Sequence, residues 1–140
     1  MERKGSAVWS GDLKSGQGQV STESAAIKNV PYGFNTRFED EPGTNPEELV
    51  GAAHASCYAM AMSLGLGEKG LKAEEINASA IVTLSEVDGG FAVTKVHLDV
   101  SAKIPGISEE DFQKIAEATK KNCPISKLLT AEITLDAKLG

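Results

Sequence analysis

The sequence is poor in cysteine and aromatic residues, and its basic residues form no cluster. Cys57 and Cys123 are the two cysteines in 140 residues, and their long separation excludes a CxxC motif and zinc-finger spacing. Lys and Arg number 14 against 20 Asp and Glu, for a net charge of -6. Because a nucleic acid or an anionic membrane would require a positive patch, neither is expected as a partner.

The chain also lacks repeats, low-complexity tracts and an apolar run in its first residues, MERKGSAVWSGD. We therefore expect no signal peptide and predict a cytoplasmic protein. In a reducing compartment, two cysteines are expected to be thiols rather than a structural disulfide. The length and the 41% hydrophobic content suit one domain, 1–140, with a core of its own.

The stretch from Leu49 to Leu66 contains no Asp, Glu, Lys or Arg and predicts a long central helix. Asn45 is placed to cap it, Pro46 suits its first position, and Glu48 falls three residues after the cap. A membrane span is rejected because the stretch contains Gly, Ser and His and its apolar content is mostly Ala. A helix that is apolar on all sides is expected to be buried.

The rest of the pattern predicts an α+β fold with antiparallel sheet. The expected elements are strands at 4–10 and 17–23, an irregular segment at 24–44, a helical turn at 71–76, strands at 78–84 and 95–104, a helix beginning at Ser108, a short helix from Pro124, and a strand at 131–139. One small sheet covers only one side of an apolar helix. We therefore expect a dimer with the long helices at its centre.

The two cysteines are the main candidates for chemistry. Cys57, in mid-helix, is either a small core residue or a nucleophile, and its position alone favours core packing. Far from the helix terminus it gains little from the dipole, so a thiolate there needs a cation from elsewhere. Cys123, at an expected helix start near Lys120 and Lys121, is locally the better placed. The pair suggests an attacking and a resolving thiol.

Other interpretations stay open from the residues alone. His54, one turn before Cys57, either tunes its pKa or is a hydrogen-bonded core histidine. His54, Cys57 and Cys123 together offer three soft metal ligands without any sign of supporting partners. Glu48 has a structural explanation as a capping residue, and Tyr32, Phe34, Phe38, Met60 and Phe91 are candidates for an apolar pocket. A non-catalytic stress protein, binding apolar ligands or sensing oxidation through its thiols, is the main rival to an enzyme.

Three segments, PYGFNTRFE, TNPEELVGAAHASCYAMAMSL and NCPIS, resemble the OsmC/Ohr family of thiol peroxidases, and the likeness extends from Gly5 to the last strand. The resemblance implies an intertwined α+β homodimer, with antiparallel sheets packed around long central helices and two active sites at its interface. It implies reduction of organic hydroperoxides, and more weakly of hydrogen peroxide, in oxidative or osmotic stress defence. An external thiol or dithiol would be the reductant, and no metal or organic cofactor is implied.

Carried over residue by residue, the resemblance makes Cys57 the peroxidatic thiol, which becomes a sulfenic acid, and Cys123 the resolving thiol of a Cys57–Cys123 disulfide. Arg37 would stabilise the thiolate and polarise the peroxide, and Glu47 would orient Arg37. This order contradicts the local argument for Cys123. We follow the family, since an arginine at hydrogen-bond range outweighs a dipole effect of ~0.3–1 kcal/mol.

Glu47 and Cys57 lie ten residues apart on the predicted helix, which corresponds to a rise of roughly 15 Å. They also point in different directions, because ten residues are not a whole number of turns. Glu47 therefore cannot reach the thiol of its own chain. Either Arg37 bridges the gap or the glutamate comes from a partner subunit; we expect the second, which makes the dimer obligatory for activity.

Overall fold

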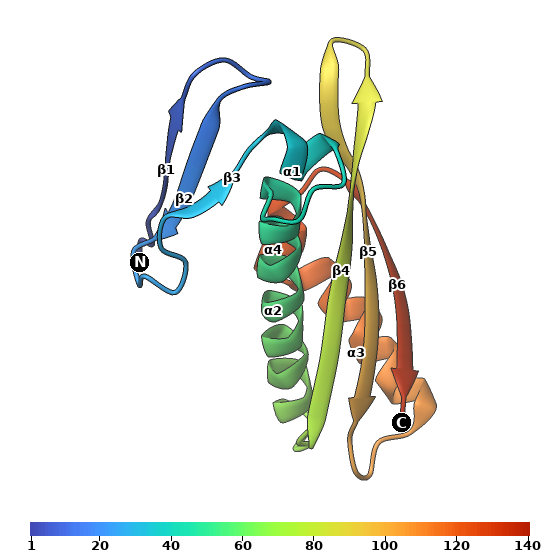
Figure 1. The fold of residues 1–140 in the computed structure, drawn as a ribbon. Coiled ribbons are helices and arrows are strands. Elements are labelled where there is room, and N and C mark those ends of the chain that lie inside the picture. The colour runs from blue at the N-terminus through green and yellow to red at the C-terminus, as the bar shows by residue number, and fades with distance from the viewer. The chain divides into compact units, whose positions relative to one another are not determined.

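The computed structural model describes residues 1–140, which divide into two compact units, Met1–Leu49 and Val50–Gly140. The elements in chain order (Figure 1) are β1 (Gly5–Ser10), β2 (Gln17–Thr22), β3 (Val30–Tyr32), α1 (Phe34–Phe38), α2 (Pro46–Gly67), β4 (Glu75–Val87), β5 (Gly90–Lys103), α3 (Glu109–Asn122), α4 (Pro124–Leu128) and β6 (Glu132–Leu139). The predicted α+β class is confirmed.

The first unit contains a three-stranded antiparallel sheet in the order β1-β2-β3. The two predicted strands at 4–10 and 17–23 are present as β1 and β2. The expectation that 24–44 is irregular is wrong, because this segment contains β3 and α1. Gly33 starts α1 by donating its N–H to Thr36 Oγ1, at 3.0 Å.

The first unit buries very little apolar surface. Every residue of β1 is exposed, and Trp9 and Tyr32 contact each other with ring centroids 5.7 Å apart. No buried hydrophobic side chain of the chain belongs to this unit. Since a small sheet needs a covered hydrophobic face for stability, this unit lacks a core of its own.

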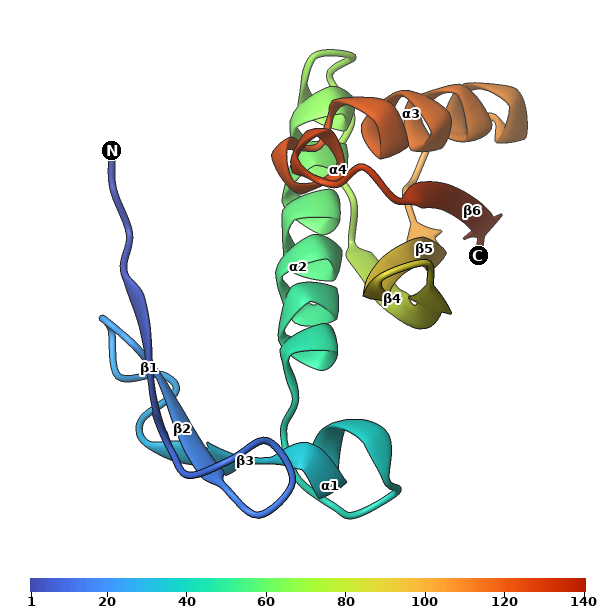
Figure 2. The same cartoon turned by 90° about the horizontal axis from the view of Figure 1, so that it is seen from above.

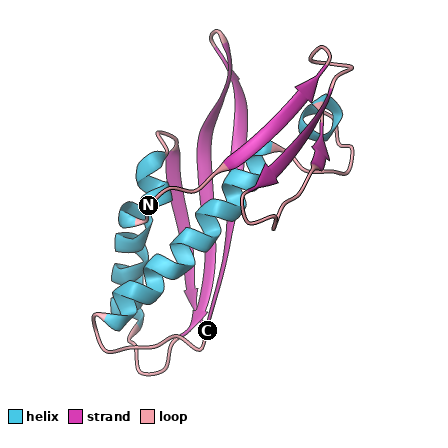
Figure 3. Ribbon diagram, turned by 90° about the vertical axis from the view of Figure 1, so that its left-hand side faces the viewer, coloured by secondary structure: helices cyan, strands magenta, loops and turns pink.

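The second unit is built on a sheet in the order β4-β5-β6. β4 and β5 form a long antiparallel hairpin, as predicted, with a bulge between Thr83 and Leu84. Helices α2 and α3 lie on the same face of this sheet (Figures 2 and 3), and residues of both contribute to one hydrophobic cluster with β5.

Two local expectations for this unit are wrong. β6 pairs with β5 in parallel, not antiparallel, and their arrows point the same way in Figure 1. The chain between them passes through α3 and α4, a crossover that returns it to the same end of the sheet. The helical turn expected at 71–76 is also absent, because β4 begins at Glu75 and the Glu74 N–H already bonds to the Lys103 carbonyl at 2.8 Å.

The core of the second unit follows the predicted periods. Alternate residues of β5 and one stripe of α3 are buried, as expected: Val96, Leu98, Val100, Ala102, Phe112, Ile115, Ala116 and Thr119. Ser108 caps α3 by accepting a hydrogen bond from the Asp111 N–H at 3.1 Å. A helix with one apolar stripe and a capped start fits this packing.

α2 is buried along a single stripe rather than on all sides. The stripe consists of Gly51, His54, Tyr58, Met62 and Leu66. Other apolar positions are open within one chain; Met60 is 77% exposed and Leu64 69%. By length and composition alone α2 would be able to cross a membrane, a test that core helices also pass. The chain by itself therefore leaves part of this helix uncovered.

At Gly51 the backbone of α2 lies so close to β4 that adding a single methyl group is expected to destabilise the fold. A Cβ added at Gly51 would lie 2.9 Å from the Ala80 carbonyl oxygen, which is fixed backbone. We expect Gly51→Ala to lower the free energy of unfolding by ~1–3 kcal/mol, measured by chemical denaturation. In the control Gly65→Ala the new Cβ meets Ile115 at an ordinary 3.6 Å. It should be neutral or stabilising by up to ~1 kcal/mol. Equal effects of both would contradict this packing.

Candidate active site

The two cysteines, far apart in the sequence, meet between α2 and the start of α4. Their Sγ atoms are 3.1 Å apart, and both residues are free thiols. Cys57 is half-buried, whereas Cys123 is fully buried. Cys123 lies at the junction of two helices, where its N–H bonds to the Thr119 carbonyl and its carbonyl accepts from the Lys127 N–H. The expected pair of thiols is thus brought together within the second unit.

The local surroundings do not favour ionisation of Cys57. Burial raises the pKa of the Cys57 thiol, and its hydrogen bond with Cys123 raises it further. The Ile125 N–H, at the start of α4, donates to the Cys57 sulfur and lowers the pKa, but by less. The surroundings of Cys57 within the second unit therefore oppose its ionisation. A reactive thiolate would require a cation from outside this unit.

Access distinguishes the two thiols. The sequence places Cys123 at a helix start, and the structure confirms that position, as α4 begins at Pro124. Yet Cys123 is 0% exposed, while Cys57 keeps an open side. The N–H of Ile125, in the first turn of α4, donates to the Cys57 sulfur. A molecule from solvent would reach Cys57 first.

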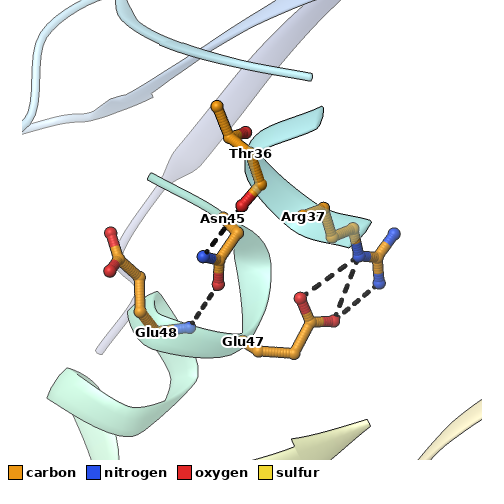
Figure 4. Close-up of polar contacts among 5 residues, drawn as sticks. All are labelled: Thr36, Arg37, Asn45, Glu47 and Glu48. Atoms are coloured by element: carbon orange, nitrogen blue, oxygen red, sulfur yellow. Dashed lines mark hydrogen bonds and ion pairs between the residues drawn. The ribbon is translucent and has the colours of Figure 1, made fainter. Parts of the chain in front are cut away.

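Arg37 and Glu47 form an ion pair within the first unit (Figure 4). Arg37 Nη2 lies 2.7 Å from Glu47 Oε1, and Arg37 Nε lies 3.2 Å from both carboxylate oxygens. The Glu47 side chain is largely buried and the Arg37 side chain partly exposed. A bidentate pair of this kind fixes the plane and direction of the guanidinium group.

The ion pair depends on the start of α2 (Figure 4). Asn45 accepts a hydrogen bond from the Glu48 N–H at 2.9 Å, which confirms it as the N-cap. The Asn45 side-chain amide also donates to the Thr36 carbonyl at 3.4 Å, which ties α1 to the first turn of α2. Arg37 directly follows Thr36, and Glu47 lies two residues after Asn45. The Asn45–Thr36 hydrogen bond therefore brings the two charged side chains opposite each other.

The structure also decides between the alternatives for His54 and for a metal site. His54 is fully buried, and its Nε2 lies 2.8 Å from Ser126 Oγ, so it is a hydrogen-bonded core histidine. No group of three His, Cys, Asp or Glu residues is arranged to hold a metal ion, which contradicts the alternative of a metal site at His54, Cys57 and Cys123.

The apolar candidates do not form one pocket. In the first unit Phe34 and Phe38 contact each other with ring centroids 4.9 Å apart, and the Arg37 guanidinium lies 5.2 Å from the Phe38 ring centroid. In the second unit Met60 and Phe91 are both exposed. Ile125 and Ser126 belong to the NCPIS segment, but sequence reasoning assigned neither a role, because their contacts with Cys57 and His54 arise only where α4 approaches α2.

The sequence is similar to those of two bacterial proteins that act on, or protect against, peroxides according to their names. It is 53% identical to peroxiredoxin OsmC of Escherichia coli (strain K12), and the match covers 99% of this chain and 97% of that protein. It is 27% identical to the organic hydroperoxide resistance protein OhrB of Bacillus subtilis (strain 168), over 75% of this chain and 76% of that one.

Solved structures share the fold. An OsmC-like protein of Vibrio cholerae superposes with a TM-score of 0.76 at 17% identity, covering 98% of this chain and 99% of that one. The crystal structure of Bacillus subtilis OhrB superposes with a TM-score of 0.69 at 19% identity, covering 98% of each chain. Residues 38–138 also match the OsmC-like protein family. The chain belongs to the OsmC-like family, as its sequence motifs predicted.

Proposed function

We propose that this chain is a cytoplasmic, cysteine-based peroxidase that reduces organic hydroperoxides, and hydrogen peroxide more weakly, in oxidative or osmotic stress defence. The observation that carries the proposal is the contact of Cys57 and Cys123 at 3.1 Å, with one sulfur accessible and the other buried. The names of the relatives, a peroxiredoxin and an organic hydroperoxide resistance protein, support the same class of reaction.

The reaction has three balanced steps. The Cys57 thiolate attacks the distal peroxide oxygen, the O–O bond breaks, and Cys57 becomes a sulfenic acid while the alcohol leaves after taking up a proton. Cys123 then attacks the Cys57 sulfur, forming the disulfide and releasing water. An external thiol or dithiol reduces the disulfide by exchange. No metal or organic cofactor has a step in this scheme.

Residues 1–140 act, in this proposal, as one OsmC-like domain that is completed by a second copy. α2 leaves Met60 and Leu64 exposed, and the first unit has no buried hydrophobic side chain. Apolar surface left open by both units is the pattern of a chain that folds together with its partner. Neither a nucleic acid nor a membrane is a partner in this proposal.

The same assembly supplies the missing cation. Arg37 is held by Glu47 of its own chain, and Glu47 lies ten residues before Cys57 on the continuous helix α2, a rise of roughly 15 Å. We propose that the Arg37–Glu47 pair of one chain serves the Cys57 thiol of the other. There Arg37 would stabilise the thiolate and the charge that develops as the O–O bond breaks.

The two thiol roles predict different defects. With tert-butyl hydroperoxide and a dithiol reductant, Cys57→Ser should reduce peroxide consumption to background, because the attacking sulfur is gone. Cys123→Ser should keep one rapid oxidation per chain, measured as a sulfenic acid trapped with dimedone, but should lose most turnover. The reverse pattern would exchange the two roles. A wild-type protein that forms the disulfide without turning over would favour the non-catalytic oxidation sensor.

The proposed cation predicts a pKa difference. In a Cys123→Ser background, the pH dependence of iodoacetamide alkylation reports the pKa of Cys57. We expect Arg37→Met to raise that pKa, because burial then acts unopposed by a positive charge. The matched control is Arg3→Met, since Arg3 is exposed and bonds only to the neighbouring Glu2 carbonyl. An unchanged pKa in Arg37→Met would remove Arg37 from the site.

Hybrid dimers test which chain supplies Arg37. Arg37→Met and Cys57→Ser chains with different affinity tags are co-expressed, and dimers carrying both tags are isolated. If the arginine serves the partner's thiol, each hybrid has one intact site, and its activity should be about half that of wild type. If Arg37 serves its own chain, no hybrid site is intact and activity stays at background. Each variant purified alone provides the baseline, and sedimentation confirms the dimer.

A further inference from the structure

The hydrogen bond between His54 and Ser126 lies beside the thiol pair and has no role in the chemistry described above. His54 is 0% exposed, and its Nε2 lies 2.8 Å from Ser126 Oγ. Its other ring nitrogen, Nδ1, is buried without a hydrogen-bond partner. A buried polar atom without a partner costs free energy, so an apolar pair would pack here at lower cost.

The His54–Ser126 and Cys57–Cys123 contacts follow each other like two rungs of a ladder between α2 and the segment that begins α4. His54 and Cys57 are three residues apart on α2, and Cys123 and Ser126 are three residues apart at the start of α4. His54 contacts Ser126, and Cys57 contacts Cys123. The segments therefore run antiparallel here, and the polar rung lies about one helical turn from the sulfur rung.

α4 depends on this rung for its position. The helix has five residues, too few to be stable by itself, and Ser126 is its one buried residue. Leu128, at its far end, is exposed. His54 therefore holds the one fully buried side chain of α4.

We propose that His54 and Ser126 are positioning residues for the disulfide-forming step of the proposed peroxidase reaction, on which this inference rests. Their hydrogen bond holds α4 against α2, so that Cys123 stays within reach of the Cys57 sulfenic acid. In that step the Cys123 sulfur bonds to the Cys57 sulfur, the S–O bond breaks, and the oxygen leaves as water with the thiol proton. The sulfurs need to approach by only about 1 Å to reach the ~2.05 Å of a disulfide.

The test separates the two chemical steps in Ser126→Ala and His54→Leu. After one equivalent of tert-butyl hydroperoxide, stopped-flow and dimedone trapping give the rates of sulfenic acid formation and decay. We expect Cys57 oxidation to change less than about threefold. Disulfide formation should slow roughly 10- to 100-fold, as misplacement of a reacting group by about 1 Å predicts. His54→Gln, which keeps a polar group near the Nε2 position, should restore much of the rate.

A matched control removes another histidine–hydroxyl bond of the same unit. His97 Nδ1 lies 2.6 Å from Thr134 Oγ1, between β5 and β6, and Thr134→Ala removes that partner. It should leave the ratio of the two rates unchanged, whatever it does to stability. Equal slowing of both steps in Ser126→Ala, or an unchanged ratio, would overturn the positioning role.

A second arm does not depend on peroxidase activity. Glutathione disulfide forms a mixed disulfide at Cys57, and attack by Cys123 then releases glutathione and closes the internal disulfide. Closure should again slow roughly 10- to 100-fold in Ser126→Ala and not in Thr134→Ala. A wild-type chain that closes rapidly here but never turns over peroxide would refute the proposed function and keep this inference. Equal closure in wild type and Ser126→Ala would overturn the inference alone.

Discussion

The packing of the buried stripe of α2 against the sheet and α3 is the interaction on which the position of Cys57 depends. At Gly51 the missing side chain lets the backbone of α2 come close to Ala80 of β4. Farther along, the Tyr58 O–H donates to the Ala116 carbonyl of α3 at 3.0 Å. These two contacts fix both the height and the rotation of the helix. Cys57, next to Tyr58, is thereby held at the edge of the stripe, half-buried and turned toward α4.

That position gives Cys57 a thiol with low intrinsic reactivity. Burial and the neighbouring Cys123 both raise its pKa, and the single N–H from Ile125 only partly opposes them. In the proposed assembly the cation comes from a partner chain. Reactivity would then depend on dimer formation, because an unassembled chain would keep its sulfur protonated.

The parts of this structure that the sequence predicted are those with one strongly buried face. The stripe of α3, the alternation of β5 and the Asn45 cap of α2 all leave periodic or positional signals. β3 and α1 are three and five residues long, too short for any period to be visible. The direction of β6 was missed because its inward–outward alternation is typical of antiparallel strands, whereas parallel strands are usually buried on both faces.

The site shows the same division between local and tertiary information. Cys57 and Cys123 attract attention because they are the only thiols, but their pairing was implied by family resemblance and not by spacing. Local reasoning favoured Cys123 as nucleophile, because a helix starts there. In the structure the N–H of Ile125, at the start of that helix, donates to the sulfur of Cys57, which lies on another helix. The packing of α4 against α2 decides which sulfur accepts a hydrogen bond from the start of α4. A local stretch of sequence does not contain that information.

The backbone around Cys123 holds in place the buried thiol that forms the disulfide in the proposed reaction. Its N–H closes the last turn of α3 through the Thr119 carbonyl, and its own carbonyl closes the first turn of α4 through the Lys127 N–H. Pro124 fixes the backbone directly after it and prevents α3 from continuing. The main chain is therefore held on both sides, and the sulfur moves mainly by rotation of its own side chain. In the proposed reaction, a thiol held in this way would reach the Cys57 sulfur, 3.1 Å away, by rotating its own side chain and without movement of the main chain.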